Sequence, residues 1–362
     1  MRALRWHGPR DLRLVDLVEP PLRRGEVRVG VAYCGICGSD LHEYVDGPHA
    51  IPVEHAHPLS GRSAPLTLGH EFCGTVVEST DAAVAPGTRV VVEPEYRCGA
   101  CDECRAGRYN LCRSMGFIGL MGDGAFADSV VVPAYTVHAL PDEVRFEQAA
   151  VFEPAAVALH AVRRSALQPG DACAVFGLGP VGLLTVAMLR QCGAGAIVAV
   201  DVQAGRLALA GRLGATATVD ASKEDAAAAV QRATGGRGAA IAFEAAGVQA
   251  TLDSALACLR KGGEAVLVGL MGRAQLDVFD AVNRELRLTC SVGYRGVHPT
   301  LIDWTARGRI DPAAIVTRTV ALEDAVARGF DALLADPAQV KVLVTPKENA
   351  GSTDGAPPPA GA

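Results

Sequence analysis

The feature that most restricts the fold is a regular alternation of apolar strands and helices between about residues 155 and 290. The alternation begins with the strand-like "DACAVFGLG" and the helical "PVGLLTVAMLRQCG", and it ends with the strand-like "EAVLVGL". Strands that are separated by helices pair in parallel, and a parallel sheet needs helices on both of its faces. The sequence therefore predicts a doubly wound α/β domain over residues 154–292.

A glycine-rich turn joins the first predicted strand of this domain to its first helix. In "VFGLGPVG" the G-x-G-x-x-G spacing permits a tight turn, the close approach of a pyrophosphate, and close helix–strand packing. Asp201 ends the next strand, at the offset where a carboxylate meets an adenosine ribose. A turn that binds nothing is the alternative, which the flanking strand and helix disfavour. The predicted cofactor-binding residues are Gly177, Leu178, Gly179, Pro180, Val181, Gly182, Asp201 and Arg206.

Asp201 also favours NAD over NADP. A carboxylate ~4 Å from a 2′-phosphate costs about 1–4 kcal/mol, depending on the local dielectric. Arg206 lies five residues further on and could neutralise part of a phosphate, but no other lysine or arginine flanks this position. We therefore expect NAD.

The remainder of the chain has a different pattern. Residues 1–153 contain short β-branched segments such as "EVRVGVAYCG" and "GTRVVVEP", bounded by Gly, Pro and Asp, which predicts a mostly β domain. A chain of 362 residues is long enough for two domains. Residues 293–346 are of mixed character, and we expect them to return to the first domain. The Gly-, Pro- and Ala-rich tail 347–362 is predicted to be disordered.

Four cysteines lie within fifteen residues, in "CGACDECRAGRYNLC". Four thiolates with short spacers can surround a Zn²⁺ ion completely, and a site with no open position is structural. An iron–sulfur cluster is the chemical alternative. The other alternative is that the four cysteines are free thiols that bind no metal. We predict a structural zinc site that is formed by Cys98, Cys101, Cys104 and Cys112.

A second set of possible metal ligands is spread over three segments. Cys37 lies in "CGICGSDLHEYVDGP", His70 and Glu71 lie in "LGHEF", and Glu153 lies in "VFEPAAVALH". A cysteine, a histidine and a carboxylate suit a catalytic zinc, because one position stays open for water or substrate. The residues do not decide whether Glu153 or Glu71 binds the metal directly. A redox pair of Cys34 and Cys37 is disfavoured, since this C-x-x-C does not open a thioredoxin-like helix.

With these motifs the sequence resembles the zinc-dependent medium-chain alcohol dehydrogenases over nearly its whole length apart from the tail. The resemblance is carried by "CGICGSDLH", "LGHEF", the four-cysteine segment, "GLGPVG" with Asp201, and "FEAAG". Within the family, "GSDLHEYVDGP" and "FEPAAVALHAV" resemble the 2,3-butanediol dehydrogenases most closely and the sorbitol dehydrogenases next. The resemblance implies an NAD-dependent oxidoreductase that interconverts a vicinal secondary alcohol and its ketone, with 2,3-butanediol and acetoin as the expected pair.

The resemblance further implies that a Rossmann domain is inserted in a GroES-like catalytic domain made of residues 1–153 and 293–346. It implies that Ser39 takes the proton of the bound alcohol and passes it through the cofactor ribose to His42, near solvent. Ser39 as a turn residue and His42 as a surface imidazole are the alternatives. The catalytic residues implied are Cys37, Ser39, His42, His70, Glu71 and Glu153, of which Cys37, His70 and Glu153 would bind the catalytic zinc.

Three other functions remain as alternatives: a sorbitol or polyol dehydrogenase, a non-catalytic nucleotide-binding relative, and a zinc-ribbon interaction module. A net charge of −6 without a long basic run argues against nucleic acid or an anionic membrane as a partner. No apolar stretch reaches the ~18–20 residues that span a bilayer, and the charged N-terminus does not resemble a secretory signal. We expect a cytoplasmic homodimer or homotetramer that acts on a small diol or hydroxyketone.

Several side chains are expected to have only structural roles. Asp40 and Glu43 are predicted on a solvated edge, and the histidines of the long insert after Gly47 are predicted to be exposed. Cys34 is expected inside a strand, where cysteine acts as a small apolar residue. Four further cysteines are expected in the core of the nucleotide-binding domain: Cys173, Cys192, Cys258 and Cys290.

Overall fold

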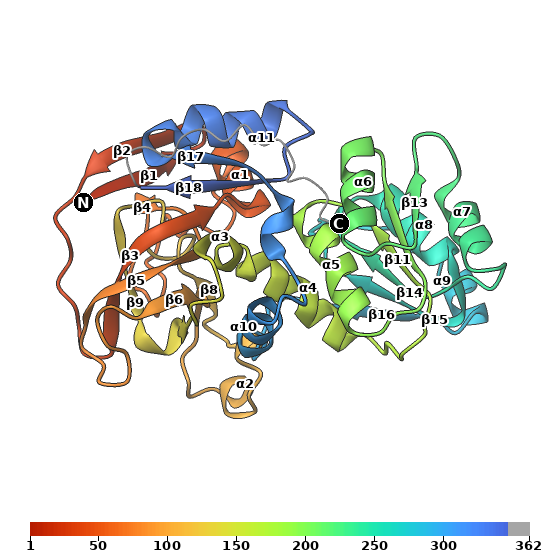
Figure 1. Cartoon of the computed structure of the whole chain (residues 1–362), viewed down its shortest axis with the longest axis horizontal. Helices are drawn as coiled ribbons and strands as arrows, with labels where there is room; N and C mark the ends of the chain where they lie inside the picture. The colour runs from red at the N-terminus through yellow and green to blue at the C-terminus, as the bar shows by residue number, and fades with distance from the viewer. Residues whose placement is uncertain (347–362) are drawn as a thin grey trace. The chain divides into compact units, whose positions relative to one another are not determined.

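The computed structural model describes residues 1–346, which form two compact units (Figure 1). Unit 1 comprises Met1–Glu153 and the described residues from His298 onward, and unit 2 comprises Pro154–Val297. The chain thus returns to unit 1 at His298, later than the residue 293 expected from the sequence. The tail that was expected to be disordered, residues 347–362, lies outside the described residues.

Unit 1 is mostly β. Its largest sheet has seven strands in the order β10-β6-β5-β3-β18-β17, with β9 also paired to β3. Two smaller sheets have the orders β2-β1-β4 and β7-β8. The strands are β1 Arg2–Gly8, β2 Asp11–Asp16, β3 Glu26–Gly35, β4 Leu66–Thr67, β5 Glu71–Ser79, β6 Arg89–Val92, β7 Glu95–Tyr96, β8 Gly116–Phe117, β9 Ser129–Pro133, β10 Val137–Ala139, β17 Val316–Ala321 and β18 Lys341–Thr345. The helices are α1 Gly38–Asp46, α2 Asp102–Arg105, α3 Phe146–Ala149, α10 His298–Ala306 and α11 Asp331–Ala335, and α4 Phe152–Arg164 begins in this unit.

Strand β3 lies at the centre of the large sheet. Its alternate residues Val27, Val29 and Val31 are buried in one apolar core with Phe72 and Val76 of β5, as the period of a strand requires. On the other edge, the C-terminal end of β3 pairs with β18, which also pairs with β17. Residues from both ends of the chain therefore form one sheet, and the end of β3 leads directly into the segment that contains Cys37.

Unit 2 is the predicted doubly wound domain. Its six strands are all parallel and have the order β13-β12-β11-β14-β15-β16. The strands are β11 Cys173–Phe176, β12 Ile197–Asp201, β13 Ala217–Asp220, β14 Ala239–Glu244, β15 Leu259–Leu267 and β16 Arg287–Cys290. The helices that alternate with them are α5 Pro180–Gln191, α6 Ala204–Arg212, α7 Ala226–Ala233, α8 Gln249–Ala257 and α9 Val278–Asn283. The fold class expected from the alternation of strands and helices is confirmed.

The cysteines of unit 2 only partly match the prediction. Cys173 and Cys258 are buried, Cys192 is half-buried, and Cys290 is exposed. Cys290 was wrongly expected in the core: it ends β16, an edge strand with few buried side chains. Among residues 1–346, no helix has the length and apolar composition needed to cross a membrane.

Candidate active site

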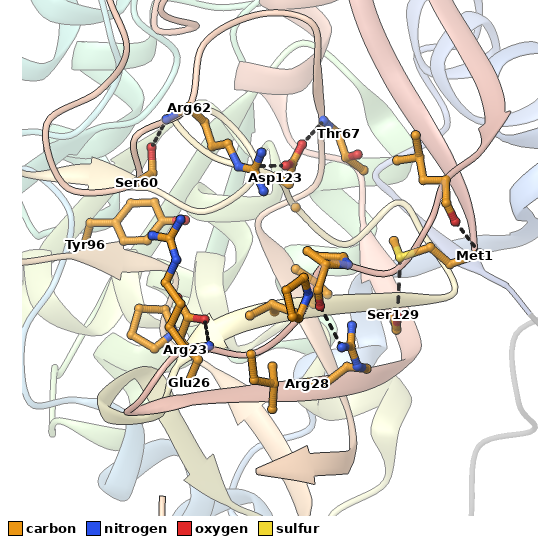
Figure 2. Close-up of a pocket in the computed structure, with 18 of the residues that line it drawn as sticks. Met1, Arg23, Glu26, Arg28, Ser60, Arg62, Thr67, Tyr96, Asp123 and Ser129 are labelled. Carbon is orange, nitrogen blue, oxygen red and sulfur yellow. Dashed lines mark hydrogen bonds and ion pairs between the residues drawn. The ribbon is translucent and has the colours of Figure 1, made fainter. Parts of the chain in front are cut away.

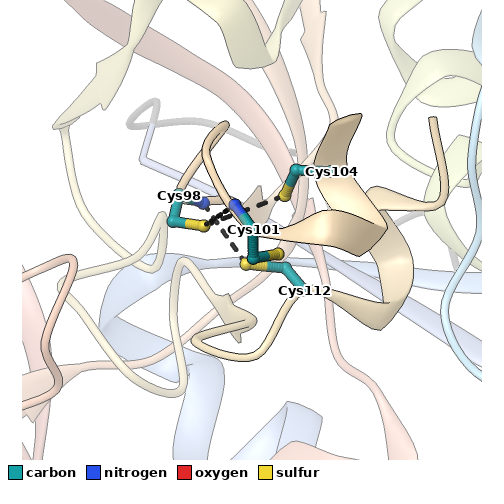
Figure 3. Close-up of side chains that lie close together, drawn as sticks. All are labelled: Cys98, Cys101, Cys104 and Cys112. Atoms are coloured by element: carbon teal, nitrogen blue, oxygen red, sulfur yellow. Dashed lines mark hydrogen bonds between the residues drawn. The ribbon is translucent and has the colours of Figure 1, made fainter. Parts of the chain in front are cut away.

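The four cysteines of the segment 98–112 converge at one point of unit 1 (Figure 3). Their sulfur atoms all lie within 4.8 Å of one another, and the Sγ atoms of Cys98 and Cys104 are 4.0 Å apart. Zn–S bonds of 2.3 Å in a tetrahedron place sulfur atoms about 3.8 Å apart, so the cluster has the size of a zinc site. Backbone N–H groups of Arg113 and Cys104 lower the pKa of Cys101 to about 6, which favours the thiolate that binds a metal.

A second group of potential ligands forms where two paired strands meet. Cys37 directly precedes α1 at the end of β3, and His70 directly precedes β5. Because Gly35 of β3 pairs with Glu71 of β5, the two loop residues lie at the same end of the sheet. Ligand atoms of Cys37, His70 and Glu71 lie within 4.8 Å of one another. The structure thus brings together Cys37 and His70, as the sequence predicted.

Asp40 orients this group, and its predicted place on a solvated edge is wrong. Its side chain is fully buried, with Oδ1 3.4 Å from Nδ1 of His70, while Oδ2 accepts a hydrogen bond of 3.0 Å from the Cys37 backbone. A carboxylate behind one nitrogen of a histidine fixes the ring and directs the other nitrogen to a metal. Burial opposes a positive charge on His70, but Asp40 and the Cys37 sulfur outweigh it and hold the pKa of His70 well above its usual value.

One sequence signal could have revealed Asp40. It stands three residues after Cys37 at the start of α1, and the two residues form a capping box there. Glu43 was also wrongly expected to be solvated. It is 1% exposed because its carboxylate accepts hydrogen bonds from the backbone N–H groups of His49, Ala50 and Ile51, which fixes the start of the long insert.

Glu71 is held by Lys341, a residue that no sequence motif singles out. Both carboxylate oxygens of Glu71 accept hydrogen bonds from Nζ of Lys341, at 2.8 and 2.6 Å, and Nζ also donates to the carbonyl of Ile36. Both side chains are almost fully buried. Burial opposes the charge on Lys341, but Glu71 and Cys37 outweigh it and raise its pKa. Only the pairing of β18 with β3 reveals this contact.

The remaining predicted catalytic residues are placed as follows. Oγ of Ser39 lies 3.2 Å from Nε2 of His70, and His42 is exposed on α1. Glu153, the second residue of α4, is buried, and its charge contributes to raising the pKa of Lys341. Within residues 1–346, however, the group of ligand atoms around Cys37 does not include Glu153.

The glycine-rich turn of unit 2 lies at the junction of β11 and α5. Gly177 has a φ of +87°, and an added Cβ would lie 2.7 Å from the Cβ of Ala246. A Cβ on Gly182 would lie 1.8 Å from the carbonyl oxygen of Gly177. Gly179, the N-cap of α5, has open space where its Cβ would be. The first and third glycines are therefore required by the protein's own packing, whereas the second leaves open space at the helix N-terminus, which suits a pyrophosphate.

Asp201 connects this turn to the next strand. Its Oδ2 accepts a hydrogen bond of 2.6 Å from the backbone of Leu178, and its Oδ1 accepts from the backbones of Val202 and Gln203. A carboxylate has about four acceptor positions, so Asp201 retains capacity for a ribose hydroxyl. Arg206 is half-buried on α6, and its Nε atom is buried without a hydrogen-bond partner.

A separate cavity of unit 1 lies elsewhere, and none of the predicted site residues lines it (Figure 2). It has a volume of about 630 Å³, and its lining includes five arginines: Arg5, Arg23, Arg28, Arg62 and Arg97. Several of these cations already have partners, since Arg62 pairs with Asp123 at 3.3 Å and Arg28 pairs with Glu78 at 3.2 Å. The cavity therefore does not compete with the Cys37 group as the active site.

Comparisons with known proteins agree with this architecture. The profile "Alcohol dehydrogenase GroES-like domain" matches residues 23–142, and the profile "Zinc-binding dehydrogenase" matches residues 180–307. The (R,R)-butanediol dehydrogenase of Bacillus subtilis is 41% identical over 96% of this chain and 100% of its own length. The sorbitol dehydrogenase of the same organism is 36% identical over 96% of this chain and 97% of its own length.

Solved structures show the same relationship. The crystal structure of 2R,3R-butanediol dehydrogenase from Bacillus subtilis has a TM-score of 0.90 and 41% identity, and the match covers 96% of this chain and 99% of that one. A putative zinc-binding dehydrogenase from Sinorhizobium meliloti, bound to NADP, has a TM-score of 0.87 and 34% identity, with coverage of 95% and 99%. The chain therefore belongs to the zinc-dependent medium-chain alcohol dehydrogenase family and is similar to its butanediol dehydrogenases.

Proposed function

We propose that the protein is a zinc- and NAD-dependent dehydrogenase that interconverts 2,3-butanediol and acetoin. The observation that carries the proposal is the convergence of Cys37 and His70, with Asp40 behind the imidazole, in a chain 41% identical to an (R,R)-butanediol dehydrogenase. The 36% identity to a sorbitol dehydrogenase makes sorbitol and related polyols the second candidate substrates.

The residues of unit 1 fit a catalytic zinc. Nδ1 of His70 and Oδ1 of Asp40 are buried and face each other at 3.4 Å, so a metal would bind through Nε2 of the ring, beside Oγ of Ser39. Glu71 is already held by Lys341, so we propose Cys37, His70 and Glu153 as the ligands, with Glu71 stabilising the site from beside it. When bound, zinc supplies Lewis acidity, which makes the substrate hydroxyl more acidic.

Ser39 and His42 are proposed to carry the proton. Ser39, the second residue of α1, lies next to His70, where its hydroxyl can take the proton that the substrate hydroxyl loses while it passes its own proton to the cofactor ribose. His42 lies one helical turn further on and is exposed, so its imidazole is in a position to pass that proton to water. A hydroxyl and an imidazole on one helix thus form the two ends of a relay out of the site.

The turn of unit 2 supports a nicotinamide dinucleotide, and we propose NAD. Two observations support this: the open space at Gly179, at the N-terminus of α5, and the acceptor capacity that Asp201 retains for a hydrogen bond from a ribose hydroxyl. The same carboxylate would repel a 2′-phosphate, although Arg206 on α6 could offset part of that repulsion. The nicotinamide ring supplies the hydride-accepting chemistry, while the protein supplies its position.

The first experiment measures NADH formation by the purified protein with (R,R)-, meso- and (S,S)-2,3-butanediol and with sorbitol. Parallel reactions contain NADP, or protein treated with a chelator. We expect chelator-sensitive reduction of NAD on one butanediol isomer. A preference for sorbitol would overturn the substrate and keep the class of reaction. No turnover of any alcohol by protein that contains zinc would favour a non-catalytic relative.

We further propose that the protein is a homo-oligomer, through an apolar surface of unit 2. Edge strand β16 and helix α9 carry exposed apolar side chains, of which Phe279 is 81% and Val282 68% exposed. An apolar surface next to an unpaired strand edge is a site where a second copy can extend the sheet. None of the eleven cysteines, which all lie within residues 1–346, forms a disulfide bond, which supports our proposal of the reducing cytoplasm as the compartment.

A further inference from the structure

A third group of possible metal ligands lies in unit 1 and belongs to neither zinc site described above. Glu93 directly follows β6, His138 is the middle residue of β10, and His298 is the first residue of α10. Strands β6 and β10 pair with each other, which brings Glu93 beside His138. Ligand atoms of the three residues all lie within 4.8 Å of one another.

One carboxylate oxygen faces both imidazoles. Oε2 of Glu93 lies 2.9 Å from Nε2 of His138 and 3.9 Å from Nδ1 of His298. The two rings are parallel within 3°, with centroids 4.9 Å apart. The other oxygen of Glu93 accepts a hydrogen bond of 2.7 Å from the hydroxyl of Tyr109, which belongs to the four-cysteine segment. The carboxylate is thus oriented from outside, while its inner oxygen points at two nitrogen donors.

These separations have the scale of a coordinated ion. Zinc bonds of 2.0–2.1 Å in a tetrahedron place two ligand atoms about 3.3 Å apart. The observed 2.9 and 3.9 Å lie on either side of that value, so small side-chain movements would admit the ion. Two imidazole nitrogens and one carboxylate oxygen are a donor set that suits Zn²⁺.

The three donors differ in their exposure to solvent. The side chain of His138 is 25% exposed, whereas those of Glu93 and His298 are 3% and 0% exposed, so the side of His138 offers an ion a route from solvent.

We propose that Glu93, His138 and His298 bind a third zinc ion, with water as the fourth ligand. The ion would join the end of β6, strand β10 and the start of α10, segments that are far apart in the sequence. Through Tyr109 it would also support the loop that carries the four cysteines. All three segments belong to unit 1, and the cluster shares no residue with the Cys37 cluster of the proposed reaction.

The test counts zinc per chain by elemental analysis after equilibration in a zinc-buffered solution. We expect three equivalents in the wild type, and two in both His298→Gln and His138→Gln. The matched control is His55→Gln, an exposed histidine outside the cluster, which should retain three. If His298→Gln does not fold, the zinc content of His138→Gln alone tests the proposal, because the side chain of His138 is partly exposed. Two equivalents in the wild type, or three in a folded His138→Gln protein, would overturn the proposal.

Cobalt distinguishes this site from the other two. Both other clusters contain thiolates, which give strong near-ultraviolet charge-transfer absorption with Co²⁺, whereas the donors proposed here are nitrogen and oxygen only. The Co²⁺-loaded His138→Gln protein should therefore lose visible ligand-field absorption relative to the wild type, and it should keep the near-ultraviolet charge-transfer absorption. If the third equivalent of Co²⁺ adds thiolate charge transfer, it is bound elsewhere and the assignment fails. If the Co²⁺-loaded wild type showed no near-ultraviolet charge-transfer band, the two cysteine-containing clusters would not bind the metal.

Discussion

At the scale of single residues, Asp40 connects two of the residues that we propose as zinc ligands in unit 1. It is a fully buried carboxylate that contacts two potential metal ligands, through the ring of His70 and the backbone of Cys37. Because both contacts are with proposed zinc ligands, we expect its contribution to be the fixing of those ligands. Carboxylates in this position behind a ligating histidine are typically worth a factor of 10–100 in metal affinity.

We therefore predict that Asp40→Asn weakens zinc binding at the Cys37 site by about 10–100-fold while the protein stays folded, because Asn has the same shape without the charge. Zinc retained against a competing chelator measures this. Asp46→Asn, an exposed position on the same helix, is the matched control and should bind zinc like the wild type. Equal retention by the two variants would contradict the role assigned to Asp40.

The types of the ligands could be predicted from sequence, but their supporting contacts could not. Cys37, His70 and the four cysteines have side chains whose chemistry suggests a metal at once. Asp40 and Lys341 are ordinary charged residues, and charged residues are usually solvated. The burial of Asp40 follows from its local cap at the start of α1, but that of Lys341 depends on which strands pair, since it meets Glu71 across 270 positions of the chain. No local pattern contains that information.

At the scale of elements, the junction of β11 and α5 separates two uses of glycine. Gly182 permits packing, because its missing Cβ would lie 1.8 Å from a backbone oxygen. Gly179 has an extended backbone that any residue can adopt, with φ −65° and ψ −176°, and open space around it. This junction was predictable because strand, turn and helix are consecutive in sequence. The seven-stranded sheet of unit 1 was harder to predict from the sequence, because its central pair, β3 and β18, joins segments that are distant in the chain.

The two glycines predict opposite outcomes for the same substitution. Gly182→Ala should destabilise the protein by about 1–3 kcal/mol or more, because the backbone must shift to make room. Gly179→Ala should keep the wild-type melting temperature but weaken NAD binding by about tenfold, equivalent to 1.4 kcal/mol, because its methyl group occupies the space left for the pyrophosphate. Thermal unfolding and calorimetric titration with NAD measure the two effects. A stable Gly182→Ala protein, or unchanged NAD affinity in Gly179→Ala, would contradict this division.

At the scale of the whole molecule, the exposed apolar surface of unit 2 predicts self-association. Phe279→Asp places a charge on a side chain that is 81% exposed in the single chain, so the variant should fold, yet it should lose the oligomer. Size-exclusion chromatography with light scattering measures the mass. Val18→Asp, at a 93% exposed position of unit 1, is the control and should keep the wild-type mass. A monomeric wild type, or an unchanged mass for Phe279→Asp, would exclude this surface.

The central position of β18 has a consequence for how the protein is made. Strand β18 lies between β3 and β17, and its first residue, Lys341, neutralises Glu71. At about 5–20 residues per second, a ribosome needs roughly 10–60 s to add the 270 residues from Glu71 to Lys341. During that interval the inserted unit, contiguous in the chain, can acquire all six of its strands, while the sheet beside Cys37 still lacks its connecting strand. Unit 1, which holds the Cys37 group, is therefore the last to mature on the ribosome, although its synthesis begins first.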